Sequence, residues 1–452
     1  MTRTSHLVLA VTGMLALVGP QAALAETLQE AFVAAYQTSP VLDAQRADLR
    51  ATDEGVSQAL SGWRPSVSVT GELATEHRNR DNSRSDTFNP KSADLTATQP
   101  LYRGGRTVAG TQAAEESVLA GRADLQSSEQ TVFFDVVRAF MDVLRDEAVV
   151  QLTGNNERVL MRHLDAANDR FRVGEVTRTD VAQSEARLAR AVSERVEAEG
   201  GLESSRATYV RVVGHAPVEL QPPPPVKGLP KSKDEATTVA LEENPDLESA
   251  IHNEASSRHT IRTVSGELLP TVALEGELTQ ADDQISSNDG TDGRRLAVQV
   301  SVPLYQSGSV YSRVREARQV NNLRRVQIED ARRSVRETAS QAWDAYVTAQ
   351  SKIKANREQV RANQVALEGV EQEAQVGSRT TLDVLDAEQE LLDSQVSLVQ
   401  DERDEYVAAM GLLLAVGRLT VEDMQLPVES YDPTANYQRV RNKWFGTDGG
   451  LD

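Results

Sequence analysis

The sequence predicts a mainly α-helical chain with a small amount of transmembrane β structure, built from one unit that occurs twice. Segment 63–73 reads WRPSVSVTGEL and returns as LLPTVALEGEL at 268–278. Two long segments, 107–213 and 310–416, are rich in Ala, Glu, Gln, Arg and Leu and contain no Pro. An internal repeat constrains architecture more than any single motif, so we expect a duplicated fold.

Further matches follow in the same order along both copies. NPDL at 244–247 corresponds to SPVL at 39–42, and PLY at 303–305 corresponds to PLY at 100–102. VG at 376–377 likewise answers VG at 173–174. We therefore divide the chain into a first repeat, 26–222, a second repeat, 223–424, and a C-terminal tail, 425–452.

The N-terminus is typical of a secretory signal peptide. Arg3 precedes a short apolar run, 7–18, and the small residues of the Ala23-Leu24-Ala25 segment follow. The run is too short to span a bilayer comfortably. We expect residues 1–25 to be removed and the mature chain to begin at Glu26.

Composition excludes several kinds of partner and site. The formal net charge of -20 argues against nucleic acid, which requires a basic surface. The chain has no Cys, which excludes disulfides and a lipid-modified N-terminal Cys, and its six His residues are scattered. We therefore expect no His/Cys metal site and no cofactor.

Four short segments show the period-2 alternation of strands with one apolar face: 67–73, 94–99, 272–278 and 296–302. Polar loops at 77–91 and 282–294 join them into two hairpins, 66–101 and 271–304. Strands of ~10 residues cross a bilayer when tilted, although soluble hairpins have the same pattern. Prolines are expected where helices meet strands, at Pro65, Pro100, Pro270 and Pro303.

The helical segments have informative lengths. Segment 105–172 would form about 100 Å of helix, and after a turn near Gly174 the return helix, 180–213, is half as long. Segment 309–375 and its return, 383–416, repeat this arrangement. We expect 180–213 to stack end to end on a helix at 234–264, and 383–416 to stack on an N-terminal helix at 27–61. The tetraproline at 222–225 would be a surface connection.

Four strands cannot close a barrel, and an open sheet edge cannot face lipid. The predicted fold class is therefore mainly α with transmembrane β, completed by oligomerisation. Each chain would supply four barrel strands and long coiled-coil helices. Three chains would then form a twelve-stranded β-barrel above an α-helical barrel.

These features resemble the TolC family of trimeric outer-membrane channel-tunnel proteins, over almost the whole chain from 26 to 427. The most specific pieces are FRVG at 171–174 with TDV at 179–181, and VGSRTTLDVLDA at 376–387. Both pieces resemble the family's inter-helix turns at the periplasmic tip. A weaker, shorter likeness at 431–446 is to members that serve type I protein secretion.

The resemblance implies a gate at these turns. Arg379 would bond Thr179 and Asp180 of a neighbouring subunit, and such charge-assisted bonds are directional and breakable. Asp383 and Asp386 would form two carboxylate rings at the pore constriction. The family often has a tyrosine where this chain has Ala374, so that part of the latch would be lost or replaced.

The turns at Gly174 and Gly377 would be the docking edge for an adaptor. The implied function is the passive exit duct of a type I secretion system, in the outer membrane of a Gram-negative-type cell and extending into the periplasm. The expected partners are two further copies in a homotrimer, outer membrane lipid, a periplasmic membrane-fusion adaptor and an inner-membrane ABC transporter. The same channel would also suit a tripartite multidrug efflux pump with another transporter.

Two other classes remain as alternatives. A periplasmic coiled-coil adaptor has long helical hairpins, but it usually carries one hairpin flanked by compact β domains. An enzyme is not expected, because no Ser/His/Asp grouping, phosphate loop or metal cluster stands out in the sequence.

Overall fold

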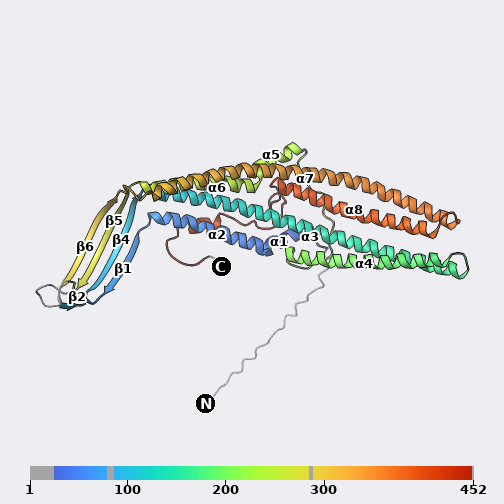
Figure 1. Ribbon diagram of the computed structural model, residues 1–452, viewed down its shortest axis with the longest axis horizontal. Helices are drawn as coiled ribbons and strands as arrows, with labels where there is room; N and C mark the ends of the chain where they lie inside the picture. The colour runs from blue at the N-terminus through green and yellow to red at the C-terminus, as the bar shows by residue number, and fades with distance from the viewer. Residues whose placement is uncertain (1–24, 79–85, 285–288, 450–452) are drawn as a thin grey trace, which may run out of the picture.

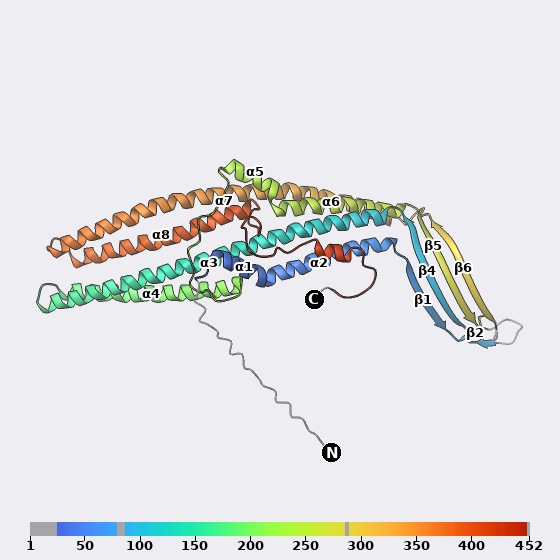
Figure 2. The same ribbon diagram turned by 180° about the vertical axis from the view of Figure 1, so that it is seen from behind.

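The computed structural model describes residues 25–78, 86–284 and 289–449, so the predicted signal peptide lies almost entirely outside the described residues. The molecule is long and narrow, with a β-sheet at one end and two helical hairpin turns at the other (Figure 1). Seen from behind, long helices again run between these two ends (Figure 2). Among the described residues, no helix combines the length and apolar character needed to cross a bilayer.

The elements repeat in order. The first copy contains α1 (Leu28–Thr38), α2 (Pro40–Leu60), β1 (Ser66–Leu73), β4 (Lys91–Arg103), α3 (Arg106–Arg172) and α4 (Arg178–Val213). The second contains α5 (Lys233–Glu243), α6 (Pro245–Ser265), β5 (Thr271–Asp282), β6 (Gly290–Ser301), α7 (Ser309–Gln375) and α8 (Thr381–Ala415). Two short strands, β2 (Glu76–Arg78) and β3 (Asp86–Phe88), extend the first hairpin, and α9 (Ala435–Val440) lies in the tail. The predicted mixture of long helices and four main strands is confirmed.

The helices predicted at 27–61 and 234–264 are each two helices. Both break before a proline, at Ser39-Pro40 and Asn244-Pro245, and the proline becomes the first residue of the next helix. Proline has no N–H for the preceding helix but suits a first helical position, where no such bond is needed. α5 is therefore a separate short helix that packs against α7, with Lys233 paired to Asp344 at 2.7 Å.

The predicted stacking of the short helices was wrong. The end of α4 meets the junction between α1 and α2, where the Thr38 hydroxyl donates to the carbonyl of Val213 at 3.2 Å. The end of α8 meets α6, where the Asn244 amide donates to the carbonyl of Ala415 at 3.2 Å. α2 thus continues the line of α4, and α6 that of α8, because the tetraproline connection carries the chain outward from α4 before α6 begins (Figure 1).

The main strands form one antiparallel sheet in the order β1-β4-β5-β6. The two copies meet at the β4–β5 pair, with Leu95 opposite Leu278. Pro100 does not mark a joint as predicted. It lies inside β4 at an irregularity in the pairing with β5, and the strand continues to Arg103. A proline cannot donate a ladder hydrogen bond, which explains the local shift of register.

The alternating apolar residues of all four strands share one face of the sheet. Val67 lies opposite Ala97, Ala97 opposite Gly276, and Gly276 opposite Leu296. Directly paired residues point to the same side. This face is uncovered in a single chain, because the side chains of Val69, Leu296 and Val298 are 74%, 76% and 63% exposed.

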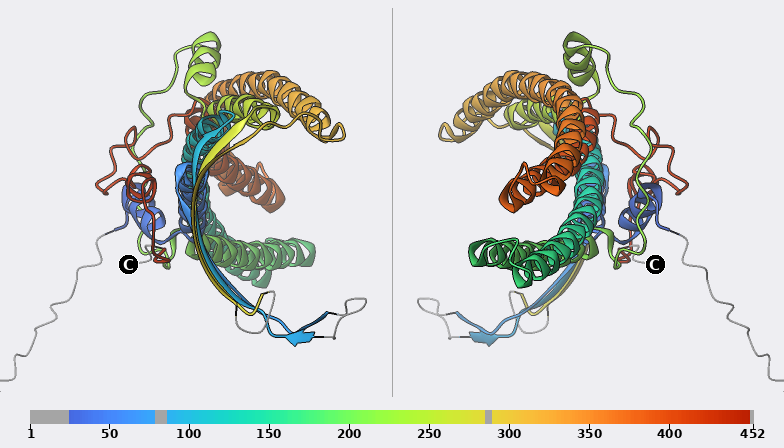
Figure 3. Two further views of the ribbon diagram at one scale, coloured as in Figure 1. Left: turned by 90° about the vertical axis from the view of Figure 1, so that its left-hand side faces the viewer. Right: turned by 90° about the vertical axis from the view of Figure 1, so that its right-hand side faces the viewer.

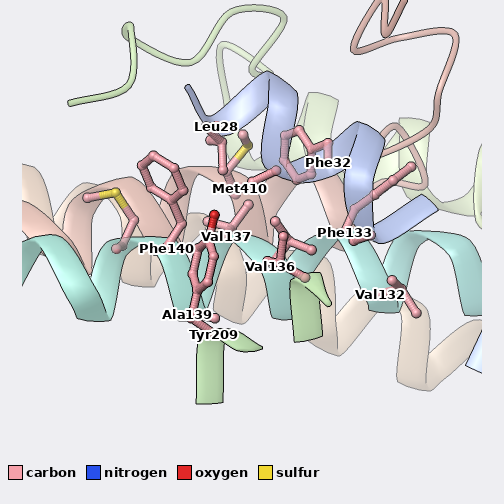
Figure 4. Packing of buried hydrophobic residues seen from close by; sticks show 14 of the residues in the cluster. Leu28, Phe32, Val132, Phe133, Val136, Val137, Ala139, Phe140, Tyr209 and Met410 are labelled. Atoms are coloured by element: carbon pink, nitrogen blue, oxygen red, sulfur yellow. The ribbon is translucent and has the colours of Figure 1, made fainter. Parts of the chain in front are cut away.

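The largest core lies midway along the helices, where α1 packs on α3 near the end of α4 (Figure 4). Phe133 is fully buried and meets Phe32 edge-on, with ring centroids 5.3 Å apart. Tyr209 donates to the buried Glu26 carboxylate at 2.6 Å, which fixes the start of the described chain against α4.

Viewed down the long axis, the helices and the sheet follow a single arc, with α5, α1 and the tail on its outer side (Figure 3). The tail is bonded along α2 and α3. Asn436 donates to Asp53 at 2.7 Å, and Arg441 donates to Glu115 at 3.1 Å. The chain is therefore a curved wall with two open sheet edges, β1 and β6.

Candidate gate at the helical turns

The two turns at the end of the molecule have the same backbone structure. Gly174 has φ +82° and Gly377 has φ +80°, a left-handed conformation that favours glycine. In each turn the residue after the glycine donates back to the last helical turn, Glu175 to Arg170 and Ser378 to Glu373, both at 2.9 Å. Such bonds satisfy carbonyls left free at a helix C-terminus. Both turns are exposed, and they lie at the same end of the molecule.

Each return helix begins with a capping box. Thr177 and Asp180 bond reciprocally at the start of α4, and Thr380 and Asp383 do the same at the start of α8. The backbone N–H of Thr177 donates to Asp180 at 2.7 Å, and that of Thr380 donates to Asp383 at 2.8 Å. These bonds, with those from the threonine hydroxyls, lower the pKa of both carboxyls. The T-x-x-D spacing in the sequence could have revealed both caps.

Arg379 lies just before the second cap and is half-exposed. Its Nε donates to Glu373 at 2.8 Å, and this bond raises the pKa of the guanidinium. Thr179 is exposed in the first turn of α4. The predicted contact of Arg379 with Thr179 and Asp180 is one between subunits, so it stays a prediction. Glu373, a neighbour of Ala374, was missed by sequence reasoning.

Asp386 has a partner in the other hairpin. Its carboxylate accepts a hydrogen bond from Arg187 of α4, across 199 positions of sequence. Asp383, by contrast, is turned back into its cap at Thr380. Within one chain, therefore, the two predicted constriction carboxylates make different contacts. Asp383 caps the start of α8, and Asp386 links the two hairpins.

Apolar contacts also join the hairpins near this end. Leu160 of α3, Ala191 of α4 and Leu385 of α8 form a small buried cluster, and Leu188 packs against it. We call this group, with the Arg187–Asp386 pair, the inter-hairpin junction. Any change in the angle between the α3–α4 and α7–α8 hairpins must rearrange this junction. The residues predicted for the gate therefore lie beside a contact between the two hairpins.

The fold is that of known outer-membrane channels. The Campylobacter jejuni CmeC outer membrane channel superposes with a TM-score of 0.78, covering 92% of this chain and 89% of that chain at 14% identity. The outer membrane protein VceC from Vibrio cholerae gives a TM-score of 0.75, with 86% and 96% covered at 17% identity.

Sequence relatives span most of the chain. The outer membrane efflux protein BepC of Brucella suis is 34% identical over 434 residues, 94% of this chain and 93% of its own. Outer membrane protein TolC of Salmonella enteritidis is 27% identical over 415 residues, 88% and 84% of the two chains. The alkaline protease secretion protein AprF of Pseudomonas aeruginosa is 25% identical over 318 residues, 68% and 65%.

The family described as outer membrane efflux protein matches twice, at residues 32–215 and 237–418. Each match takes in one copy of the repeat, with its helices, its strand pair and its turn. The turn geometry, the duplicated wall and these two matches together show that the chain belongs to the outer membrane efflux protein family, which places it in the outer membrane.

Proposed function

We propose that three copies of this chain form a passive exit duct through the outer membrane and across the periplasm. The observation that carries the proposal is the open curved wall, whose sheet has two unpaired edges and an uncovered apolar face. Unpaired edges are incompatible with lipid, so β6 of one chain would pair with β1 of the next. Twelve strands would then close around a lumen, with the apolar face toward lipid and the helices continuing the tube below.

The periplasmic end of this duct would be its gate. Arg379 would exchange Glu373 for Thr179 and Asp180 of the neighbouring subunit when the trimer closes. Glu373 and Thr179 are exposed and Asp180 is only partly buried, so the exchange does not require breaking a buried ion pair. Asp383 and Asp386 would add threefold carboxylate rings that favour cations.

The exposed turns at Gly174 and Gly377 would be the docking edge. Nothing lies within 4 Å of the position of an added Cβ at either glycine, so the turn surface is open to a partner. We propose that a periplasmic adaptor hairpin packs there, linking the duct to an inner-membrane transporter. The chain itself would act as a conduit and not as an enzyme.

Type I protein secretion with an ABC transporter is the first candidate for the physiological system. The likeness to AprF, named for secretion of alkaline protease, and the ordered tail favour it. Multidrug efflux is the second candidate, and the greater identity with the efflux protein BepC favours it. Deletion of the gene separates them: loss of a secreted protein without drug sensitivity supports the first, and drug sensitivity without a secretion defect supports the second.

Mass measurement tests the assembly directly. Native mass spectrometry of the detergent-solubilised protein should give a trimer. A monomer under mild conditions would contradict the proposal that three chains close a barrel, and would favour the adaptor class.

Conductance in planar bilayers tests the gate. We expect Arg379→Ser to raise the closed-state conductance, because the inter-subunit bond is lost. Arg361→Ser is the matched control, since Arg361 pairs with Glu358 on the exposed surface of α7. Equal conductance of wild type and Arg379→Ser would exclude the gate role of Arg379.

A further inference from the structure

Three titratable side chains from three helices converge near the inter-hairpin junction. His163 lies on α3, Glu371 on α7 and Glu388 on α8, and each offers a ligand atom within 4.8 Å of the others. Nε2 of His163 lies 3.6 Å from a carboxylate oxygen of Glu388. The side chains of His163 and Glu388 are only 28% and 13% exposed, so the group is partly withdrawn from water.

This set of donors suits a transition-metal ion. We propose that His163, Glu371 and Glu388 form a binding site for a divalent cation of the Zn²⁺ type. Zinc is commonly held by three protein ligands of imidazole and carboxylate character, with water in the fourth position. Ligand atoms around such an ion lie about 3 to 3.5 Å apart, which small side-chain rotations would achieve here. The imidazole favours Zn²⁺ over Mg²⁺ or Ca²⁺.

Linear sequence gives no sign of this site, because His163 is distant in the chain from both Glu371 and Glu388 and the three ligands lie on three separate helices. Metal motifs are recognised in sequence by close spacing, and the scattered His residues led us to expect no such site. The antiparallel packing of α8 beside α3, with α7 as the partner of α8, brings the ligands together.

The position of the site suggests what a bound ion would do. His163 lies one helical turn from Leu160, and Glu388 one turn from Leu385, so the site adjoins the apolar cluster of the inter-hairpin junction. It is on the order of 16 Å of helix from the turn at Gly174. Because α3 belongs to one hairpin and α7 and α8 to the other, the ion would clamp the hairpins together. This role rests on the proposed function of the turns as a gate.

Metal binding is tested on the full-length trimer in detergent, by equilibrium dialysis against Zn²⁺ with metal quantification and by calorimetry. We expect one Zn²⁺ per chain, with affinity lowered roughly tenfold or more in both His163→Ala and Glu388→Gln. His252→Ala is the matched control, because His252 also faces a carboxylate, Glu116 at 2.7 Å, but far from the turns on α6. Circular dichroism confirms that each variant is folded.

Two outcomes would overturn the site. Unchanged affinity in both His163→Ala and Glu388→Gln means that His163 only pairs with Glu388. Loss of binding in Asp386→Asn, with His163→Ala unaffected, assigns the ion to the gate carboxylates instead. Neither measurement requires a conducting channel, so failure of the proposed duct function leaves the binding result intact.

The clamp is tested in planar bilayers. Micromolar Zn²⁺ on the side of the turns should lower the open probability of the wild type and leave His163→Ala unchanged. Equal inhibition of both proteins would refute the clamp.

Discussion

Asp180 and Asp383 each accept two hydrogen bonds from the threonine three residues earlier, which sets their response to acid. Both carboxyls have a pKa below the ordinary value of 3.8, and the bond from the threonine backbone is the main cause. A group whose pKa is lowered by folding stabilises the folded state above its ordinary pKa and loses that effect as pH falls through the folded value. The caps should therefore open only below pH 3.8.

Substitution of one cap threonine tests whether the cap holds the start of α8. We expect Thr380→Val to increase hydrogen exchange in the first turn of α8 at neutral pH, because the N-terminal amides lose an acceptor. Exchange mass spectrometry of peptides covering 376–386 measures this. Thr348→Val, on the exposed surface of α7, should have no such effect. Unchanged exchange in Thr380→Val would contradict the assigned cap.

Phe133 is one of the largest fully buried side chains of the central core. It is fully buried between Phe32 and Tyr36. Phe133→Ala should destabilise the fold by about 3 to 5 kcal/mol, since it removes a large apolar side chain and leaves a cavity. Thermal unfolding of the solubilised protein should show a clear fall in Tm. Phe171→Ala, at the exposed turn, is the control and should unfold near the wild-type temperature.

The candidate gate illustrates which residue contacts can be predicted from a sequence. Glycines at the turns and the T-x-x-D caps are local patterns, so they are visible in the linear chain. The Arg187–Asp386 pair and the His163 group depend on how separate helices pack. One face of a helix offers many charged residues, and only tertiary packing selects which of them meet.

At the scale of elements, strand pairs and long helices were predictable because their periodicity is strong. α3 and α7 are both 67 residues long, as the repeat implied. The order of stacking was not predictable from chain order. It depends on contacts at the helix ends, such as Thr38 with Val213, and on a proline-rich connection whose path carries no periodic signal.

The tail is an element with a testable structural role. Asp53 is buried, and burial raises the pKa of its carboxyl, while the amide of Asn436 supplies its hydrogen bond. Truncation after Ser430 would remove this donor and the partner of Glu115. We expect a lower Tm of the trimer but an unchanged conductance, since the tail lies outside the wall. An unchanged Tm would show that the tail contributes nothing to stability.

At the scale of the whole molecule, the two faces of the sheet should respond differently to charge. Val298 belongs to the uncovered apolar face, and Gln299 points to the other side of β6. Val298→Arg should disfavour membrane insertion by up to about 2 to 4 kcal/mol, whereas Gln299→Arg should be tolerated, because that face would line the lumen of the proposed duct. Yields of folded trimer in isolated outer membranes measure the difference. Equal yields would argue against lipid contact at Val298.

The stacked helices have a mechanical consequence. Two contacts between helix ends lie near the middle of the helical part, where α4 and α8 end. They join Val213 to Thr38 and Ala415 to Asn244. Across that plane, each chain has two continuous backbones, α3 and α7, and two interrupted ones. A torque applied at the turns would reach the sheet end through an unbroken helix only along α3 and α7. Along the other two lines it would have to pass through the noncovalent contacts between helix ends. We therefore expect the half that carries the turns to twist more easily than the half that carries the sheet.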